Sequence, residues 1–459
     1  MLGKRVIVAA ACMMVGLSAA AQELAPLPPQ PEGLAWPTDG WEEGALPEGV
    51  ADDVQALVGE AMQKEPGEPM GVTRAVVIIH DGKLVLEAYR DGFGPETKQV
   101  SWSMAKSITS ALVGRAVELG LVEDIDAPMP SPFEDDDPRS EITWRQWLTM
   151  TDGLDYLEIG ATSMAENDVI QMMYGPGRHD VIQYVVSELE PAHEPGRHWN
   201  YSTAGFHLIG WALQAELAGS PDIEADSEEA MGILQRNWPV FDKLNENANG
   251  QRQLGSVDFM AGPYENHENI ERNWSQDELD WFYRTATLTD FMHLALFEQI
   301  GIDAQPEFDA AGTHLGGSLV WASARDFAKF GYLYLRDGVW EGERLLPEGW
   351  VDFSRTDPDV TDSNIYGAGW WITPSETPSL EGQAAVSPPY DAFSAQGHEG
   401  QTIWVVPSRD LVIVRLGLMP NGGDNWPALY EWNQQVARAF PETRFASNSD
   451  EAPAAETTP

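Results

Sequence analysis

The residues best suited to do chemistry in this chain are Ser103 and Lys106, which stand three positions apart. Apolar residues recur at three- and four-residue intervals from Met104 to Leu119, which predicts a helix with a wide apolar face ending at Gly120. On such a helix a lysine amine can reach the hydroxyl three residues earlier. Burial would favour the neutral amine, which can take a proton from serine. The pair therefore supplies a nucleophile and its base, and the serine N–H at the helix start supplies one oxyanion donor.

The same two residues also fit a purely structural interpretation. A serine commonly caps the start of a helix, and a lysine on an apolar helix can extend its amine to solvent. The pair by itself does not decide between the two interpretations, so residues elsewhere in the chain must.

A second candidate lies in the turn-rich stretch 195–205, where Tyr201 precedes a predicted helix from Phe206 to Leu217. A tyrosine on such a loop can face a cleft, and beside a lysine its phenol could shuttle a proton. The structural alternative is a half-buried tyrosine, with Ser202 or Thr203 capping the helix. Taken alone, this stretch favours the structural alternative.

A third candidate is the turn in which Gly397 and Gly400 enclose His398, between two predicted strands. Glycine lets the backbone approach a ligand closely. The N–H of Gln401 could then complete an oxyanion hole with the N–H of Ser103, and the histidine could donate a hydrogen bond to substrate or to the tyrosine. The alternative is a glycine-rich hairpin with a surface histidine.

Together the three stretches resemble the three motifs of serine β-lactamase-related hydrolases. In chain order they are Ser103-Met104-Ala105-Lys106, Tyr201-Ser202-Thr203 and His398-Glu399-Gly400. The tyrosine-led second motif is similar to that of class C β-lactamases, their esterase relatives and 6-aminohexanoate-dimer hydrolases. The likeness extends from about Arg74 to Phe440, and only 219–283 and the two tails fall outside it.

The resemblance implies an acyl-enzyme mechanism. Ser103 would be the nucleophile, Lys106 its activator, and Tyr201 the general base and acid that serves the leaving group and water. The backbone N–H groups of Ser103 and Gln401 would form the oxyanion hole.

Two departures from the family pattern bear on the substrate. His398 stands where β-lactamases usually have a lysine that helps to bind a substrate carboxylate, and many esterase and amidase relatives also carry histidine there. Thr203 replaces an asparagine that is common in the tyrosine motif and helps to orient substrate. Both changes favour hydrolysis of an ester or a small unstrained amide over hydrolysis of a β-lactam.

We expect side chains in or beside the motifs to bind substrate, namely His398, Gly400, Thr203, Trp102 and Trp199. Two further tryptophans, Trp370 and Trp371, could help to line a pocket for an apolar acyl group. Packing in the core is nevertheless the more frequent use of tryptophan.

The hydrophobic pattern also predicts the elements that must position these residues. The predicted strands are Arg74–Ile79, Lys83–Tyr89, Gly316–Ala322, Tyr366–Thr373, Phe393–Gln396, Gln401–Val406 and Leu411–Leu416, and a two-residue Asp81-Gly82 turn joins the first two. The predicted helices include 142–151, 206–217, 324–335 and 425–440. This order indicates an α/β (α+β) fold with one sheet built from both chain ends and an inserted, mainly helical lobe. The resemblance implies that the sheet is antiparallel and the fold β-lactamase/transpeptidase-like.

We divide the chain into a signal peptide at 1–21, a Pro-rich arm at 22–50, a serine hydrolase domain at 51–440 and a disordered acidic tail at 441–459. Within the hydrolase domain we expect the sheet at about 70–100 and 316–440, and the helical lobe at about 127–314. The lobe carries an acidic, weakly periodic insertion, 219–283, whose role the sequence leaves open.

The N-terminus predicts export. Lys4 and Arg5 precede an apolar run, Val6–Leu17, and the small residues at 19–21 fit a cleavage site. We therefore expect a periplasmic or secreted protein. Cys12 is an alternative site for lipoprotein anchoring. Because it is the only cysteine, an intramolecular disulfide and a thiolate zinc site are excluded.

The composition narrows the classes of partner. A formal net charge of −46 argues against general attraction to nucleic acid or anionic membranes. The histidines lack the spacing of zinc-binding helices, so we expect neither a metal nor a cofactor. The expected partner is a small-molecule ester, amide or peptide substrate, and no apolar run is long enough for a membrane span. The oligomeric state stays open.

The sequence thus predicts an exported serine hydrolase that cleaves an ester or small unstrained amide through an acyl-serine. Two alternatives stay open. One is a β-lactamase or D,D-peptidase that uses the same residues on cell-wall-type substrates. The other is a catalytically silent envelope-binding protein of the same fold.

Overall fold

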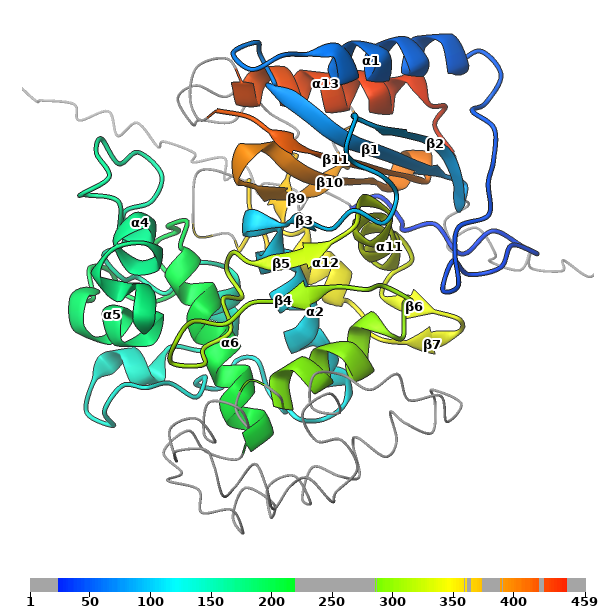
Figure 1. Cartoon of the computed structure of the whole chain (residues 1–459). Coiled ribbons are helices and arrows are strands. Elements are labelled where there is room, and N and C mark those ends of the chain that lie inside the picture. The colour runs from blue at the N-terminus through cyan, green and yellow to red at the C-terminus, as the bar shows by residue number, and fades with distance from the viewer. Residues whose placement is uncertain are drawn as a thin grey trace, which may run out of the picture.

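A six-stranded antiparallel sheet forms the upper half of the structure, a computed structural model (Figure 1). The structure describes residues 24–218, 285, 287–358, 360, 365–373, 389, 391–420 and 425–443. The strand order is β2-β1-β11-β10-β9-β8. The strands are β1 (Val72–His80), β2 (Lys83–Tyr89), β8 (Trp371–Ile372), β9 (Phe393–Gly397), β10 (Gln401–Val406) and β11 (Leu411–Leu418). The predicted hairpin 74–89 is confirmed, and the pairing of β1 with β11 joins the two ends of the chain in one sheet.

Helices cover both faces of this sheet. In Figure 1, α1 (Ala51–Gln63) and α13 (Asn425–Ala439) lie side by side above it, and α11 (Ala324–Leu335) lies below. Along β1, Val76 and Ile78 pack toward α1 and α13, whereas Val77 and Ile79 pack into the main core with α11. This strand therefore has a continuous apolar run, because both of its faces are buried.

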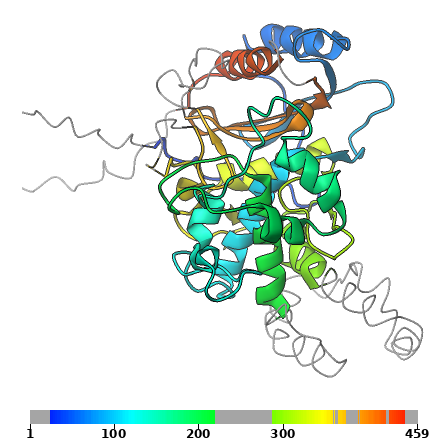
Figure 2. The ribbon, with the colours of Figure 1, turned by 90° about the vertical axis from the view of Figure 1, so that its left-hand side faces the viewer.

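The helical region lies below the sheet, on the side away from α1 and α13, as Figures 1 and 2 show. Its principal helices are α2 (Ala105–Glu118), α3 (Trp144–Leu148), α4 (Asp168–Met173), α5 (Val181–Glu188) and α6 (Thr203–Ala218). Every residue of α2 from Ala105 to Ala116 is buried, Lys106 included. A helix buried on all sides can hold a polar side chain only if that side chain finds partners inside the protein.

A second, three-stranded sheet contains the strand that directly precedes the Ser103 turn and α2. It has the order β3-β5-β4, with β3 at Gln99–Val100, β4 at Gln305–Pro306 and β5 at Val320–Ala322. The sequence predicted that all of Gly316–Ala322 forms a strand of the main sheet. That prediction is wrong, because β5 belongs to the separate three-stranded sheet. The strand begins only at Val320, because the preceding residues form turns and Val320 pairs with the segment before Ser103.

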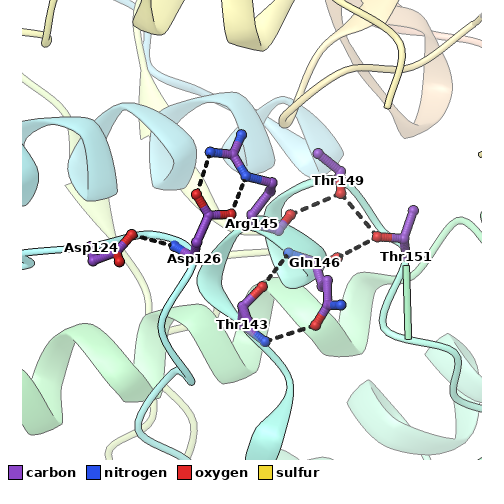
Figure 3. Close-up of polar contacts among 7 residues, drawn as sticks. All are labelled: Asp124, Asp126, Thr143, Arg145, Gln146, Thr149 and Thr151. Carbon is purple, nitrogen blue, oxygen red and sulfur yellow. Dashed lines mark hydrogen bonds and ion pairs between the residues drawn. The ribbon is translucent and has the colours of Figure 1, made fainter. Parts of the chain in front are cut away.

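The short helix α3 is fixed at its start and followed by a bonded turn (Figure 3). Thr143 and Gln146 form a capping box at the N-terminus, and Arg145 forms a salt bridge with Asp126. The Thr149 and Thr151 hydroxyls lie 3.1 Å apart in the turn that follows. This helix covers only the middle of the predicted segment 142–151, and its anchored turn leads directly into the loop beside the candidate site.

The N-terminal arm is docked on α11 through aromatic side chains. Trp36 and Trp41 both contact the ring of Tyr332, and Trp36 also contacts Trp340. These contacts hold the Pro-rich arm against the body of the protein. The expected signal peptide (1–21), insertion (219–283) and acidic tail (441–459) lie almost wholly outside the described residues. Among the described helices, none is long and apolar enough to cross a membrane.

Candidate active site

Ser103 lies in a single 3-10 turn, Trp102–Met104, which runs directly into α2. Trp102 has a φ of +46°, in the left-handed region that a bulky residue seldom adopts. Such strain persists only where the surroundings fix the backbone, and it is concentrated at functional sites. Two hydrogen bonds of the Ser101 hydroxyl, to Ser318 O at 3.2 Å and from Val320 N–H at 3.0 Å, provide that fixation.

Lys106 is 1% exposed, and its Nζ has three oxygen partners. They are Ser103 Oγ at 2.9 Å, Thr203 Oγ1 at 2.8 Å and Gly317 O at 2.7 Å. An ammonium can donate to all three oxygens. A neutral amine has two hydrogens and one lone pair, so it can donate to Thr203 and Gly317 while its lone pair faces the serine hydroxyl. The geometry therefore suits both protonation states of the lysine.

Burial lowers the pKa of Lys106 to about 8, although the nearby carboxylate of Glu158 acts in the opposite direction. The amine lies 4.9 Å from the ring centroid of Tyr201. Burial, and then the charge of Glu158, raise the pKa of the Tyr201 phenol, while hydrogen bonding with Ser103 lowers it. Near neutral pH the phenol thus carries its proton, and the amine is the group closest to titrating.

Two glycines that the sequence did not single out make the lysine site possible. A Cβ on Gly317 would lie 2.6 Å from Thr203 O, and one on Gly316 would lie 2.7 Å from Thr109 Oγ1. Gly317 N–H donates to Nδ1 of His207 at 3.2 Å. Burial holds the pKa of His207 well below its usual range, so the ring is a neutral acceptor. The glycine pair thereby brings a backbone carbonyl into contact with Lys106.

The end of β9 runs against the Ser103 turn at Gly397. A Cβ there would lie 2.2 Å from Ser101 O and 3.2 Å from Ser103 N, so only glycine fits. In the register of β9 with β10, Gln401 lies opposite Gly397. The exposed His398 ring lies 5.3 Å, edge to face, from that of Trp102. The structure therefore brings the third predicted stretch next to the first.

The turn between β9 and β10 is bonded from within the sheet by Arg415, which is fully buried. Its Nη1 donates to Gly400 O at 2.8 Å and Glu399 O at 3.2 Å, and Gln401 Nε2 donates to His398 O at 3.1 Å. Three successive carbonyls of the turn are thus bonded to side chains. Glu399 and Gly400 have φ values of +61° and +79°, a conformation that these bonds stabilise.

Two of the residues expected to bind substrate, Gly400 and Thr203, instead contact other residues of the protein. A side chain at Gly400 would point at Arg415, and Gly400 supports the turn through its backbone. Thr203 is 1% exposed and its hydroxyl accepts from Lys106. The structure thus makes Thr203 a partner of the lysine, whereas His398 is exposed and Trp102 is half-buried beside it.

Aromatic rings form a wall beside the phenol of Tyr201. Trp371 stacks on Tyr201 with ring centroids 5.3 Å apart, and Tyr366 meets both rings edge-on. Trp199 joins this group through Tyr366 at 5.9 Å. Trp370 instead is fully buried and stacks on Phe330, so it belongs to the core.

The loop after α3 adds a residue that the sequence did not indicate. Glu158 Oε2 accepts the N–H of Thr203 at 3.1 Å, at the start of α6. Its neighbours Leu157 and Ile159 are exposed, as are Met164 and Tyr174 further along the same segment. These are four of the five large exposed apolar side chains in the described part of the chain. The signal in the sequence was only the nearby stretch 142–154, which the resemblance includes.

The described residues contain no group of three or more His, Cys, Asp or Glu side chains placed to hold a metal ion.

The Beta-lactamase family model matches residues 68–417. The chain belongs to the beta-lactamase family. Of the curated proteins, the 6-aminohexanoate-dimer hydrolase of Paenarthrobacter ureafaciens is 23% identical over 361 residues, covering 76% of this chain and 73% of the relative. Among solved structures, a putative 6-aminohexanoate-dimer hydrolase from Bacillus anthracis matches with a TM-score of 0.54 and 18% identity, over 91% of this chain and 90% of that one.

The protein is therefore a serine hydrolase of the beta-lactamase family, with the β-lactamase/transpeptidase-like fold. The resemblance and the α/β (α+β) class predicted from the sequence are both confirmed. The roles of individual site residues stay predictions, and the contacts above are the basis on which they can be tested.

Proposed function

We propose that this beta-lactamase family hydrolase cleaves an ester or a small unstrained amide through an acyl-Ser103 intermediate. The observation that carries the proposal is the triple contact of Lys106 Nζ with Ser103 Oγ, Thr203 Oγ1 and Gly317 O. A buried amine with a lowered pKa, bonded to a serine hydroxyl at the start of a helix, is an activated nucleophile site.

In acylation, neutral Lys106 takes the proton of Ser103 as Oγ attacks the carbonyl carbon. The charge that develops on the carbonyl oxygen is stabilised by the N–H groups of Ser103 and Gln401. As the intermediate collapses, the phenol of Tyr201 gives its proton to the leaving oxygen or nitrogen, and Lys106 returns a proton to the phenol. The amine ends this step neutral.

In deacylation, water attacks the acyl carbon and gives a proton to Tyr201, which passes its own proton to Lys106. Collapse of the second intermediate returns that proton from Lys106 to Ser103 Oγ. Tyr201 thus acts as a relay, because its raised pKa keeps it protonated while the amine titrates.

Charge and polarity around the site support a neutral or cationic substrate with an apolar part. His398 replaces the lysine that would bind a substrate carboxylate, and the Glu158 carboxylate lies close enough to act on the charges of Lys106 and Tyr201. Exposed apolar side chains at Leu157 and Ile159 flank that carboxylate. A β-lactam or D,D-peptide would bring its own carboxylate into this negative environment. The curated relative is named for a 6-aminohexanoate dimer, a linear amide that carries both a carboxylate and an ammonium, so its name supports an unstrained amide among the substrates and no particular substrate charge.

The test is a comparison of substrate classes. Turnover of p-nitrophenyl butyrate and short amides, without turnover of nitrocefin, would support the proposal. Rapid nitrocefin turnover without ester hydrolysis would favour a β-lactamase. If neither substrate is hydrolysed and no fluorophosphonate labels Ser103, the catalytically silent alternative gains.

We also propose that the protein is exported to the periplasm or secreted, on the basis of the basic and apolar N-terminal residues 4–17. Cell fractionation, with N-terminal sequencing of the mature chain, tests this. A chain that retains Met1 in the cytoplasmic fraction would contradict it.

A further inference from the structure

Glu158 is held in a fixed position beside the catalytic residues. Its carbonyl accepts from Asn167 Nδ2 at 3.0 Å, and the neighbouring Leu157 exchanges two hydrogen bonds with Asp168 at the start of α4. The loop that carries the carboxylate is therefore tied to a helix end at two adjacent residues. A side chain on such a loop keeps its direction at lower entropic cost than one on a free loop.

Two consecutive hydrogen bonds connect this carboxylate to the lysine. Glu158 Oε2 accepts from Thr203 N–H at 3.1 Å, and Thr203 Oγ1 accepts from Lys106 Nζ at 2.8 Å. Thr203 is the first residue of α6, where backbone N–H groups lack partners within the helix and a negative charge is favoured. The bond thus fixes the residue whose hydroxyl receives the lysine.

Apart from Glu158, the groups that face Lys106 are neutral. Ser103 and Thr203 present hydroxyls, Tyr201 a protonated phenol, and His207 a ring that burial keeps neutral. Within the described residues Glu158 forms no ion pair at 4.0 Å or less. Its field therefore acts on the lysine and phenol without neutralisation by a nearer cation.

We propose that Glu158 is a positioning residue of the catalytic centre, which orients Thr203 through its N–H and determines the pH range in which Lys106 serves as the base. The inference rests on the proposed function and deepens it. Glu158 raises the pKa of Lys106 against the effect of burial, and it adds to the effect of burial on Tyr201. Both contributions disappear if the carboxylate becomes neutral, so both groups then lose their protons at lower pH.

Glutamine and alanine at this position separate charge from geometry. Glu158→Gln keeps an oxygen that can accept the Thr203 N–H but removes the charge, whereas Glu158→Ala removes both. The matched control is Asp155→Asn, which removes one charge from an exposed side chain in the same loop. Thermal unfolding of each variant establishes that it is folded.

The measurement is the rate at which a fluorophosphonate labels Ser103, followed as a function of pH in the full chain. We expect the midpoint of the rise to move to lower pH by roughly half a unit or more in both Glu158 variants, and to stay unchanged in Asp155→Asn. Labelling at high pH should fall a few-fold in Glu158→Gln and about tenfold in Glu158→Ala, because only the latter leaves the Thr203 N–H without its acceptor.

A midpoint in Glu158→Gln that matches the wild type, or moves to higher pH, would overturn the inference about Glu158 and leave the proposed function standing. Equal high-pH rates in the Gln and Ala variants would overturn the orienting role. Failure of the wild type to be labelled at any pH would overturn the proposed function, and this inference with it.

Discussion

The two sides of the candidate site are constructed in opposite ways. On the α2 side, the proposed reacting groups are side chains, and Lys106 is bonded to Ser103, Thr203 and Gly317. On the side of the turn after β9, the expected donor is a backbone N–H, and the side chains of Arg415 and Gln401 donate to the carbonyls of the turn. The proposed function of the α2 side thus depends on the identity of its side chains. The proposed function of the turn depends on the shape of its backbone.

This difference predicts which mutations should change the catalytic rate alone and which should also change stability. Substitutions on the α2 side should remove chemistry and leave the fold largely intact. Substitutions that disturb the turn should shift a backbone donor, and should therefore affect stability and rate together.

Ser103→Ala and Lys106→Ala should each lower kcat/KM for an ester substrate by about a thousandfold or more, because one removes the nucleophile and the other its base. Both variants should unfold cooperatively near the wild-type temperature. Initial rates and thermal unfolding are the measurements. Retained activity in either variant would contradict the assignment of the α2 side.

Gly397→Ala should lower kcat by about a hundredfold, since its Cβ would lie 2.2 Å from Ser101 O and push the strand away from the Ser103 turn. The φ of Gly397 is −129°, so the effect is one of contact and not of backbone preference. The control is Gly59→Ala in α1, where a Cβ meets nothing within 4 Å. That control should leave the rate unchanged and stabilise the fold by about 0.5–1 kcal/mol.

The wild-type rate should rise with pH as Lys106 loses its proton. Its pKa of about 8 means that kcat/KM at pH 6 should be roughly a hundredfold below the plateau above pH 9, because the neutral amine is the active form. A pH–rate profile with a neutral ester, corrected for spontaneous hydrolysis, is the measurement. A rate that is flat between about pH 5 and about pH 10 would rule out this role for the lysine.

Arg415→Lys should reduce both stability and rate. The guanidinium donates to Thr73 Oγ1 and to the carbonyls of Met70, Val72, Glu399 and Gly400, and one ammonium can satisfy at most three of these acceptors. We expect the free energy of unfolding to fall by about 2–4 kcal/mol, and kcat to fall about tenfold with a smaller change in KM. Denaturant unfolding and steady-state kinetics test this. An unchanged kcat would mean that the turn keeps its active shape without the hydrogen bonds of Arg415.

His398→Lys should have the smallest effect. The side chain is exposed, so a new cation there should raise kcat/KM for a carboxylate-bearing ester only a few-fold relative to a neutral one. The ratio of the two substrates in wild type and variant is the measurement. A gain of several hundredfold would show that the histidine alone excludes anionic substrates.

Several parts of the fold and site were accessible from the sequence because they depend on local pattern. The hairpin of β1 and β2, the helix after Ser103 and the closing helix near 425–440 all follow from hydrophobic period and turn residues. Short edge elements were less predictable. Of the predicted strand Tyr366–Thr373, only Trp371–Ile372 pairs in the sheet, since pairing depends on the neighbouring strand and not on the local sequence.

Glu158 and the Gly316–Gly317 pair illustrate what local pattern cannot supply. A single acidic residue in a loop has no distinguishing sequence feature, and its bond to Thr203 spans 45 positions. The contact of Gly317 with Lys106 spans 211 positions. Both depend on the packing of α2, α6 and the small sheet against one another.

The candidate reacting groups, the order of the three motifs and the periodic elements that carry them could all be identified from the sequence, because residue type and period are local properties. The tertiary structure decided which of these groups touch, how deeply Lys106 is buried, and which carbonyls and carboxylates surround it. The physical reason is that the basicity of a buried amine depends on desolvation and on charges within a few ångströms, and these come from segments far apart in the chain.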